Sequence, residues 1–92
     1  MTVVPMSKRR TRYDLMRVIL ESLRINGAMG ITRLSYAANL PVDRTKKIVE
    51  TLLEKGFIHV IKENTYTLYV LTARGGELLN ALQVIKNYLS KE

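Results

Sequence analysis

The feature that most constrains the fold is residues 31–56, where one helical pattern stops and a second starts at once. Leu40-Pro41 ends the first pattern, because a residue that precedes proline is pushed out of the α-helical region. The second pattern ends at Gly56, a residue type that takes the left-handed conformation found after helix C-termini. This segment therefore predicts two helices joined by a tight turn.

The inward faces of three helices are expected to supply the core. Ahead of this pair, residues 12–25 show apolar side chains at three- and four-residue spacing, and Asn26-Gly27 ends that pattern. Thr32 is expected to be the N-cap of the helix that follows. The side chains predicted to face inward are Leu15, Met16, Ile19, Leu20, Leu23, Leu34, Ala37, Ala38, Ile48, Val49, Leu52 and Leu53. A chain of 92 residues supports one core of this kind, and a domain so small often gains stability from a second copy.

A β-hairpin is predicted after the third helix. Residues 57–61 and 65–71 are rich in β-branched and aromatic side chains, and the polar turn Lys62-Glu63-Asn64 lies between them. The second strand has apolar groups in both phases, so its buried face is ambiguous. We expect Tyr69 and Leu71 to point inward.

The last predicted helix covers residues 73–90, with Thr72 as its cap. Four apolar residues on it are spaced four, three and four apart, as in a heptad seam. They are Leu78, Leu82, Ile85 and Leu89. This helix has more apolar surface than one small domain usually hides, which predicts pairing with a second copy.

Basic residues are concentrated in the first half of the chain. Residues 1–47 hold ten Lys or Arg against three Asp or Glu, whereas residues 48–92 hold five of each. A one-sided basic surface favours a polyanionic partner through counterion release. The alternative is a basic protein that its charge merely keeps in solution.

Several classes of function lack the residues that they need. The chain has no cysteine, and His59, its one histidine, has no second histidine to share a metal. Gly75-Gly76 lacks the Lys-Ser/Thr that follows in a phosphate-binding loop, and no catalytic triad can be assembled. No apolar run approaches 18 residues. We therefore expect no enzyme, cofactor, metal, membrane partner or small-molecule ligand, and a cytoplasmic, nucleoid-associated location.

The order of elements is that of a winged helix-turn-helix domain with an added C-terminal helix, a mainly α fold with one small hairpin. The chain resembles the archaeal winged-helix family that includes the small basic chromatin proteins of crenarchaea. Three pieces carry the likeness: Thr-Arg-Leu-Ser-Tyr-Ala-Ala-Asn-Leu at 32–40, Leu-Leu-Glu-Lys-Gly-Phe-Ile at 52–58 and Leu-Thr-Ala-Arg-Gly-Gly-Glu-Leu-Leu at 71–79. The resemblance implies DNA binding by a homodimer joined through an antiparallel coiled coil of the C-terminal helices.

These arguments divide the chain into three parts. Residues 1–11 are expected to form a flexible basic arm, residues 12–72 the winged helix-turn-helix domain, and residues 73–92 the dimerisation helix.

The candidate DNA contacts fall into four groups. In a helix-turn-helix pair, the second helix enters the major groove with its first residues on base edges, and the first helix crosses the backbone. The wing and a basic arm can add phosphate and minor-groove contacts. In chain order the candidates are Lys8, Arg9, Arg10 and Arg12 on the arm; Arg33, Ser35 and Tyr36 on the first helix of the pair; Asp43, Arg44, Lys46 and Lys47 on the second; and Lys62 on the wing.

Explanations other than DNA contact remain open for these residues. Exposed cations are often only solvated, and Tyr36 could equally be a core residue. Tyr66 and Tyr69 could stack on single-stranded bases, although aromatic residues in strands more often pack. The prediction for the whole chain is double-stranded DNA binding by a dimer, as a chromatin-associated protein or a small regulator. The alternative is a protein-interaction or scaffold module that does not bind DNA.

Overall fold

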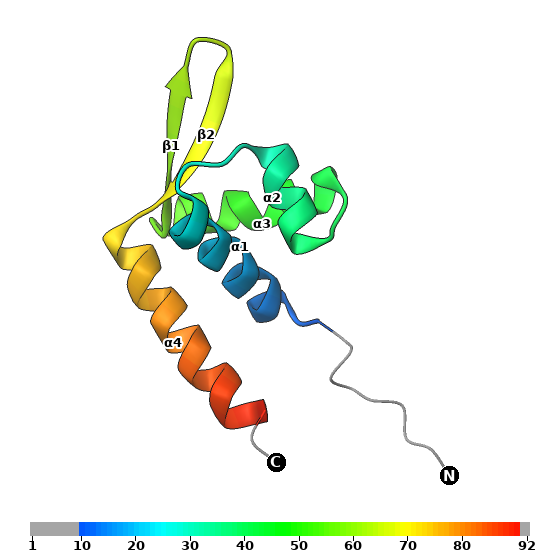
Figure 1. Cartoon of the computed structure of the whole chain (residues 1–92), viewed down its shortest axis with the longest axis vertical. Coiled ribbons are helices and arrows are strands. Elements are labelled where there is room, and N and C mark those ends of the chain that lie inside the picture. The colour runs from blue at the N-terminus through cyan, green and yellow to red at the C-terminus, as the bar shows by residue number, and fades with distance from the viewer. Residues whose placement is uncertain (1–9, 91–92) are drawn as a thin grey trace.

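The computed structural model describes residues 10–90 and shows four helices and one antiparallel hairpin in the predicted order (Figure 1). The elements are α1 (Arg12–Asn26), α2 (Ile31–Ala38), α3 (Val42–Glu54), β1 (Ile58–Glu63), β2 (Tyr66–Leu71) and α4 (Ala73–Ser90). The three N-terminal helices form a bundle, the hairpin projects from one end of it, and α4 lies along α1 (Figure 1). The winged-helix fold class is confirmed.

Helix α1 is the centre of the core. Thr11 caps it, with its hydroxyl accepting from the Asp14 backbone N–H at 3.1 Å while the Asp14 carboxylate accepts from the Thr11 N–H at 3.0 Å. This reciprocal pair satisfies two donors at the helix start. All five of the side chains predicted to be inward on this helix are buried: Leu15, Met16, Ile19, Leu20 and Leu23.

Helix α2 differs from the prediction in two details. Its N-cap is Gly30, not Thr32, and Gly30 offers no side-chain cap. The helix starts earlier because Met29 is still paired with Tyr69 through two backbone hydrogen bonds of 3.0 and 2.8 Å, and the chain turns directly from that bridge. Ala37 is exposed, whereas Ser35 is buried with Leu34 and Ala38, so the inward stripe is rotated from the predicted one.

The turn between α2 and α3 is tight because the backbone closes on itself. Asn39 takes a left-handed conformation with φ of 55°, and its N–H donates to the Tyr36 carbonyl. The Leu40 N–H donates to the Ser35 carbonyl at 3.0 Å. This is a Schellman ending, with asparagine in the position usually taken by glycine. Pro41 then starts α3 from extended backbone.

Helix α3 buries Thr45, Ile48, Val49 and Leu52, and leaves Leu53 half-buried. It ends as the sequence predicts, because Gly56 has a φ of 78° and its N–H donates to the Leu53 carbonyl at 3.1 Å.

The first strand of the hairpin ends later than predicted, and so the turn is shifted along the chain. Glu63 pairs with Tyr66, so Asn64 and Thr65 make the two-residue turn, and Asn64 has a positive φ of 54°. Lys62 is a strand residue that faces Thr67, not a turn residue. Asparagine accommodates the positive φ that a two-residue turn requires, which places the turn one residue further along.

Helix α4 is fixed to the domain at its start. The Thr72 hydroxyl accepts from the Gly75 N–H at 3.0 Å and donates to the Gly56 carbonyl at 2.7 Å, which confirms the predicted cap. Gly75 is required here, because a Cβ atom would lie 1.9 Å from the Phe57 carbonyl oxygen. Leu79 and Leu82 are buried in the same core as α1.

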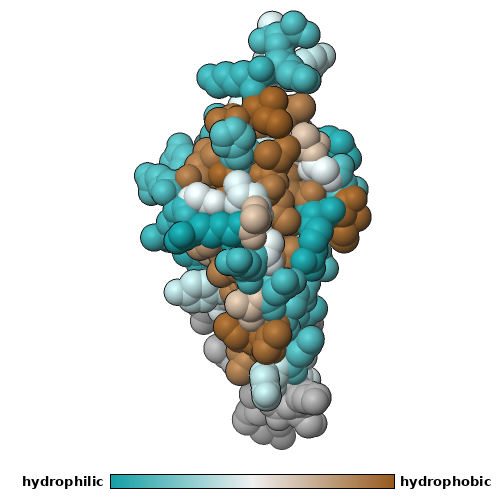
Figure 2. Space-filling model, turned by 90° about the vertical axis from the view of Figure 1, so that its left-hand side faces the viewer, coloured by the Kyte–Doolittle hydropathy of each residue, from teal (hydrophilic) through white to brown (hydrophobic). Residues whose placement is uncertain are grey.

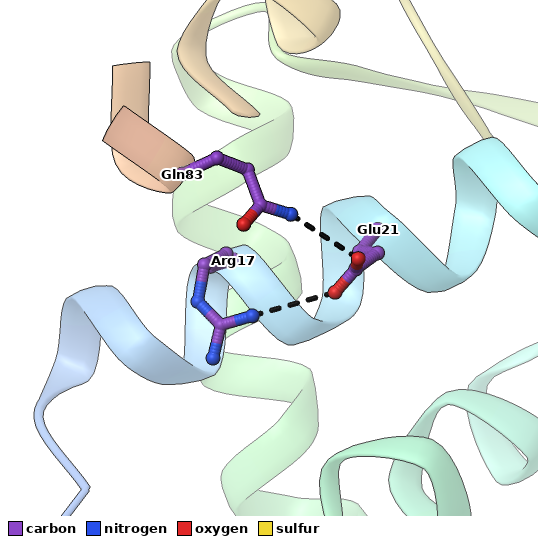
Figure 3. A network of polar contacts seen from close by, with 3 residues as sticks. All are labelled: Arg17, Glu21 and Gln83. Atoms are coloured by element: carbon purple, nitrogen blue, oxygen red, sulfur yellow. Dashed lines mark hydrogen bonds and ion pairs between the residues drawn. The ribbon is translucent and has the colours of Figure 1, made fainter. Parts of the chain in front are cut away.

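A polar network joins the middle of α4 to α1 (Figure 3). The Arg17 guanidinium and the Gln83 amide both point toward the Glu21 carboxylate, at 3.3 and 3.1 Å. Glu21 thus ties the two helices together beside their apolar contact, and it sets the position of the second half of α4.

Candidate nucleic-acid interface

The first two turns of α3 form an exposed basic surface. Thr45 lies in the interior, and its hydroxyl donates to the Pro41 carbonyl at 3.0 Å. Ile48 is also buried, so both residues hold this face against the core. The residues between and before them point outward. These are Asp43, Arg44, Lys46 and Lys47, and all four are exposed.

Charge changes sign along this helix. Glu50 and Glu54 are exposed, and their spacing from Lys47 places them on the same outward face, one and two turns further on. Sequence reasoning overlooked these carboxylates, although the three- and four-residue spacing could have revealed them. Cations therefore occupy the first half of this outward face, and carboxylates occupy the second half.

Two arginines at the start of α1 reach the helix pair. The Arg10 guanidinium donates to the Ala38 carbonyl at the end of α2. The Arg12 guanidinium donates to the Thr51 hydroxyl on α3 at 2.7 Å. The predicted arm residues Lys8 and Arg9 lie outside the described residues.

These arginines and α3 line one open hollow of about 430 Å³. Its walls carry four cationic side chains, and its apolar lining comes from Leu15 and Ile48. The cations are Arg10, Arg12, Arg44 and Lys47. Within residues 10–90, none of the four forms an ion pair; the pair found there joins Arg17 to Glu21.

The residues predicted on α2 have different environments. Tyr36 is 79% exposed, which rules out the core alternative and leaves its hydroxyl available. Arg33 is also exposed. Ser35 is 5% exposed, and its hydroxyl donates to the Thr32 carbonyl at 2.6 Å. The predicted phosphate contact of Ser35 is therefore wrong, because its hydroxyl is used within its own helix.

The wing contributes little charge. Lys62 is exposed on β1 next to Glu63, and His59 is exposed on the same strand. Tyr69 packs half-buried against the core, whereas Tyr66 is 67% exposed near the turn. Packing thus accounts for Tyr69 and leaves Tyr66 as an exposed aromatic side chain.

A second surface, more apolar than the first, lies on α4. The predicted dimer seam is divided: Leu82 is buried and Leu78 half-buried in their own chain, whereas Ile85 and Leu89 are 52% and 74% exposed. Tyr88 is exposed beside them. The seam residues line a largely apolar groove of about 460 Å³ between α4 and the start of α1. Figure 2 shows a small apolar patch toward the lower end of the molecule, where α4 finishes, separate from a larger apolar area in the upper centre of this face.

No helix within residues 10–90 has the length and apolar character to cross a membrane. In that same stretch, no three His, Cys, Asp or Glu side chains cluster in a way that could hold a metal ion.

Comparisons with known proteins agree with the fold. A family model described as winged helix-turn-helix matches residues 9–90. Sso10a-2, a DNA-binding protein from Sulfolobus solfataricus, is 25% identical, with a TM-score of 0.78, over 87% of this chain and 81% of its own. The predicted likeness to archaeal winged-helix proteins is thereby confirmed. No curated protein sequence matches the chain.

Two more solved structures share the fold. AF1382 from Archaeoglobus fulgidus is 14% identical over 88% of this chain and 89% of its own, with a TM-score of 0.75. The MarR family transcriptional regulator SPO1453 from Silicibacter pomeroyi is 24% identical over 80% of this chain, with a TM-score of 0.67. The match covers 54% of that regulator, so this chain corresponds to about half of it.

Proposed function

The chain belongs to the winged helix-turn-helix family, and from that premise we propose that it binds double-stranded DNA through the first half of α3 and the start of α1. The observation that carries the proposal is the cluster of four cations around one open hollow, none of them in an ion pair among the described residues. Unneutralised cations held close together repel one another, and a polyanion relieves that repulsion while releasing its counterions. The DNA-binding relative from Sulfolobus supports the same conclusion.

Binding with little sequence preference follows from the residue types. Lysine contacts phosphate as a point charge, whereas arginine can bond guanine through two hydrogen bonds. Arg44 is the one arginine on α3, and the carboxylates of Glu50 and Glu54 occupy the second half of its outward face. We therefore favour a chromatin-associated, architectural protein over a regulator of a few sites. Footprinting on genomic fragments tests this choice, since discrete protected sites would support the regulator.

We also propose a homodimer joined through α4. Ile85 and Leu89 expose apolar surface on one edge of a groove whose other residues include Tyr13 and Leu82. Covering apolar surface contributes roughly 25 cal/mol per Å². A second copy carries the same stripe on the same helix, so a two-fold axis perpendicular to α4 lets the two helices run antiparallel and cover both stripes at once. Residues 12–72 would then be the DNA-binding unit, and residues 73–92 the dimerisation helix.

The test is a fluorescence-anisotropy titration of the protein onto random and genomic duplex at two salt concentrations. We expect Arg44→Ala, Lys46→Ala and Lys47→Ala combined to weaken binding about thirty-fold, or ~2 kcal/mol, and to flatten the salt dependence. Arg24→Ala, Lys55→Ala and Arg74→Ala combined remove the same charge from positions outside the hollow and outside the α4 groove, and they serve as the control. Equal loss in both variants would contradict an α3 interface. No binding by the wild-type protein would favour the protein-interaction alternative.

A further inference from the structure

We propose that Arg10, Arg12, Arg44 and Lys47 form a clamp for a backbone phosphate of duplex DNA at the junction of α1 and α3. This phosphate clamp deepens the proposed function and rests on it. It assigns the start of α1, and not only the helix pair, a direct contact with the DNA strand.

The hollow has the features of a site for an anionic polymer. Its four cations come from two separate helices and the residues that lead into α1, so they surround the opening instead of lying in a row. Leu15 and Ile48 form its floor and are 5% and 7% exposed. Apolar groups beneath the cations lower the local dielectric constant, which strengthens their attraction for a phosphate. The hollow is open to solvent, so a strand can pass through it.

Both arginines are already oriented toward the helix pair. Arg10 donates to the Ala38 carbonyl, one of the groups that a helix C-terminus leaves without an intrahelical partner. The negative end of the α2 dipole favours a cation there. Arg12 donates to Thr51, whose own hydroxyl donates to the Lys47 carbonyl at 3.2 Å.

These contacts leave most of the donors unused. A guanidinium has five N–H groups, and each arginine spends only one of them on the protein in the contacts described. The rest remain available to phosphate oxygens, and a charge-assisted bond to phosphate is about twice as strong as a neutral one. A side chain that is oriented before binding loses less entropy when it binds.

The location of the clamp determines which phosphate it holds. Arg44 and Lys47 lie in the first two turns of α3, the part of a recognition helix that approaches the bases. A phosphate held between them and Arg12 belongs to the strand that borders the groove at that end. The clamp therefore sets the register of α3 on the duplex, while Glu50, one turn after Lys47, keeps the backbone away from the second half.

The decisive comparison is between Arg12→Ala and Arg24→Ala, two single-charge changes at opposite ends of α1. Arg24 is exposed and donates to Asn80 on α4, away from the hollow. For each DNA-binding unit, we expect Arg12→Ala to reduce the slope of log affinity against log salt. Arg10→Ala with Arg12→Ala should reduce it further, by up to about 0.9, the share of the one clamped phosphate. Arg24→Ala should leave the slope at the wild-type value.

A second variant separates orientation from charge. Thr51→Val removes the hydroxyl that holds Arg12 but keeps the side-chain shape and the net charge. We expect the affinity to fall about three- to fivefold with the salt slope unchanged, because the phosphate contact survives without its preset geometry. Circular dichroism and a thermal melt will verify that each variant is folded.

The outcomes distinguish the clamp from the wider proposal. One outcome overturns the clamp alone. The wild-type protein binds duplex and Lys46→Ala weakens that binding, but Arg12→Ala and Arg24→Ala give the same slope of log affinity against log salt. DNA binding through α3 then stands. If wild type does not bind duplex, both proposals are overturned. A reduced slope for Arg12→Ala together with a lower affinity for Thr51→Val supports the clamp.

Discussion

Helices α3 and α4 bury one face each in the same core, yet they expose opposite kinds of surface. The exposed start of α3 carries Arg44, Lys46 and Lys47, whereas the exposed end of α4 carries Ile85 and Leu89. A solvated cation costs little in water, so α3 is stable with or without DNA. An exposed apolar stripe remains unfavourable until something covers it. In the proposed dimer, the partner of α4 would add stability by covering apolar surface, whereas the proposed DNA contact of α3 would serve function alone.

The first turns of the two helices are stabilised in different ways. Thr72 caps α4 with its side chain, whereas Pro41 starts α3 without any side-chain hydrogen bond to the first turn. The first turn of α3 holds the acidic Asp43, whose charge offsets the positive dipole end, whereas the first turn of α4 holds no acidic residue. A side-chain hydrogen bond thus stabilises the start of α4, and a charge near the dipole stabilises the start of α3.

The largest effect is expected when charge replaces the apolar stripe of α4. Ile85→Asp with Leu89→Asp should raise the dissociation constant of the dimer by two to three orders of magnitude, about 3–4 kcal/mol, because each chain loses two apolar contacts and would bury two charges. Analytical ultracentrifugation measures the change.

Both positions are exposed within their own chain, so the helical circular dichroism should not change. A wild-type protein that is monomeric at 100 µM, or a double variant that remains dimeric, would contradict the proposed homodimer through α4.

The next largest effect concerns the half of α4 that belongs to the core. Leu79 has no exposed surface, so Leu79→Ala should lower the free energy of unfolding by about 3 kcal/mol through a cavity and lost apolar burial. Urea denaturation measures it. Asn87→Ala, at an exposed position of the second half, should change it by less than about 0.5 kcal/mol. Similar losses of unfolding free energy in the two variants would contradict the distinction between a core half and an exposed half of α4.

A smaller gain is expected when the charge of α3 is made uniform. Glu50→Lys with Glu54→Lys extends the basic face along the helix, and we expect duplex affinity to rise about tenfold with a steeper salt dependence. Glu77→Lys on α4 is the control, since it adds positive charge on a different helix. If the two changes on α3 did no more than the control, the second half of α3 would lie away from the DNA.

The smallest effect tests the difference in capping. Thr72→Ala should cost about 1 kcal/mol of unfolding free energy, since it removes the bond from the Gly75 N–H and the bond to the Gly56 carbonyl. Thr32→Ala should cost less than about 0.5 kcal/mol, because Gly30, not Thr32, is the N-cap of α2. Thermal melts compare the two. A larger loss at Thr32 would contradict the observed start of α2.

Much of the fold was predictable because local rules act within a few residues. The spacing of Leu15, Ile19 and Leu23 marks a buried helical stripe, and Gly56 and Thr72 mark an ending and a beginning. Errors arose where a distant contact decided the outcome. The β-bridge between Met29 and Tyr69 places the start of α2 earlier than predicted. These two residues are forty positions apart, so no local sequence pattern predicts their pairing.

The candidate site was predictable in residue type but not in arrangement. The exposed cations of α3 follow from their spacing against Ile48, since the opposite face of the helix must be buried. Ser35 was misplaced because a short helix with a rotated stripe buries a polar residue whose hydroxyl bonds its own backbone. The division of the α4 seam, with Leu82 inside and Leu89 outside, depends on where α1 begins, because the end of α4 lies beside the start of α1.

By itself, the sequence determined the order of the elements, the identity of most core residues and the concentration of positive charge in the first half, because periodicity, capping and composition are local properties. Only the tertiary structure decided that Arg10 and Arg12 lie beside Arg44 and Lys47 around one hollow, and that α4 is part core and part exposed seam. The physical reason is that such neighbours are brought together by packing between helices, which depends on the shape of the whole core and not on any one segment.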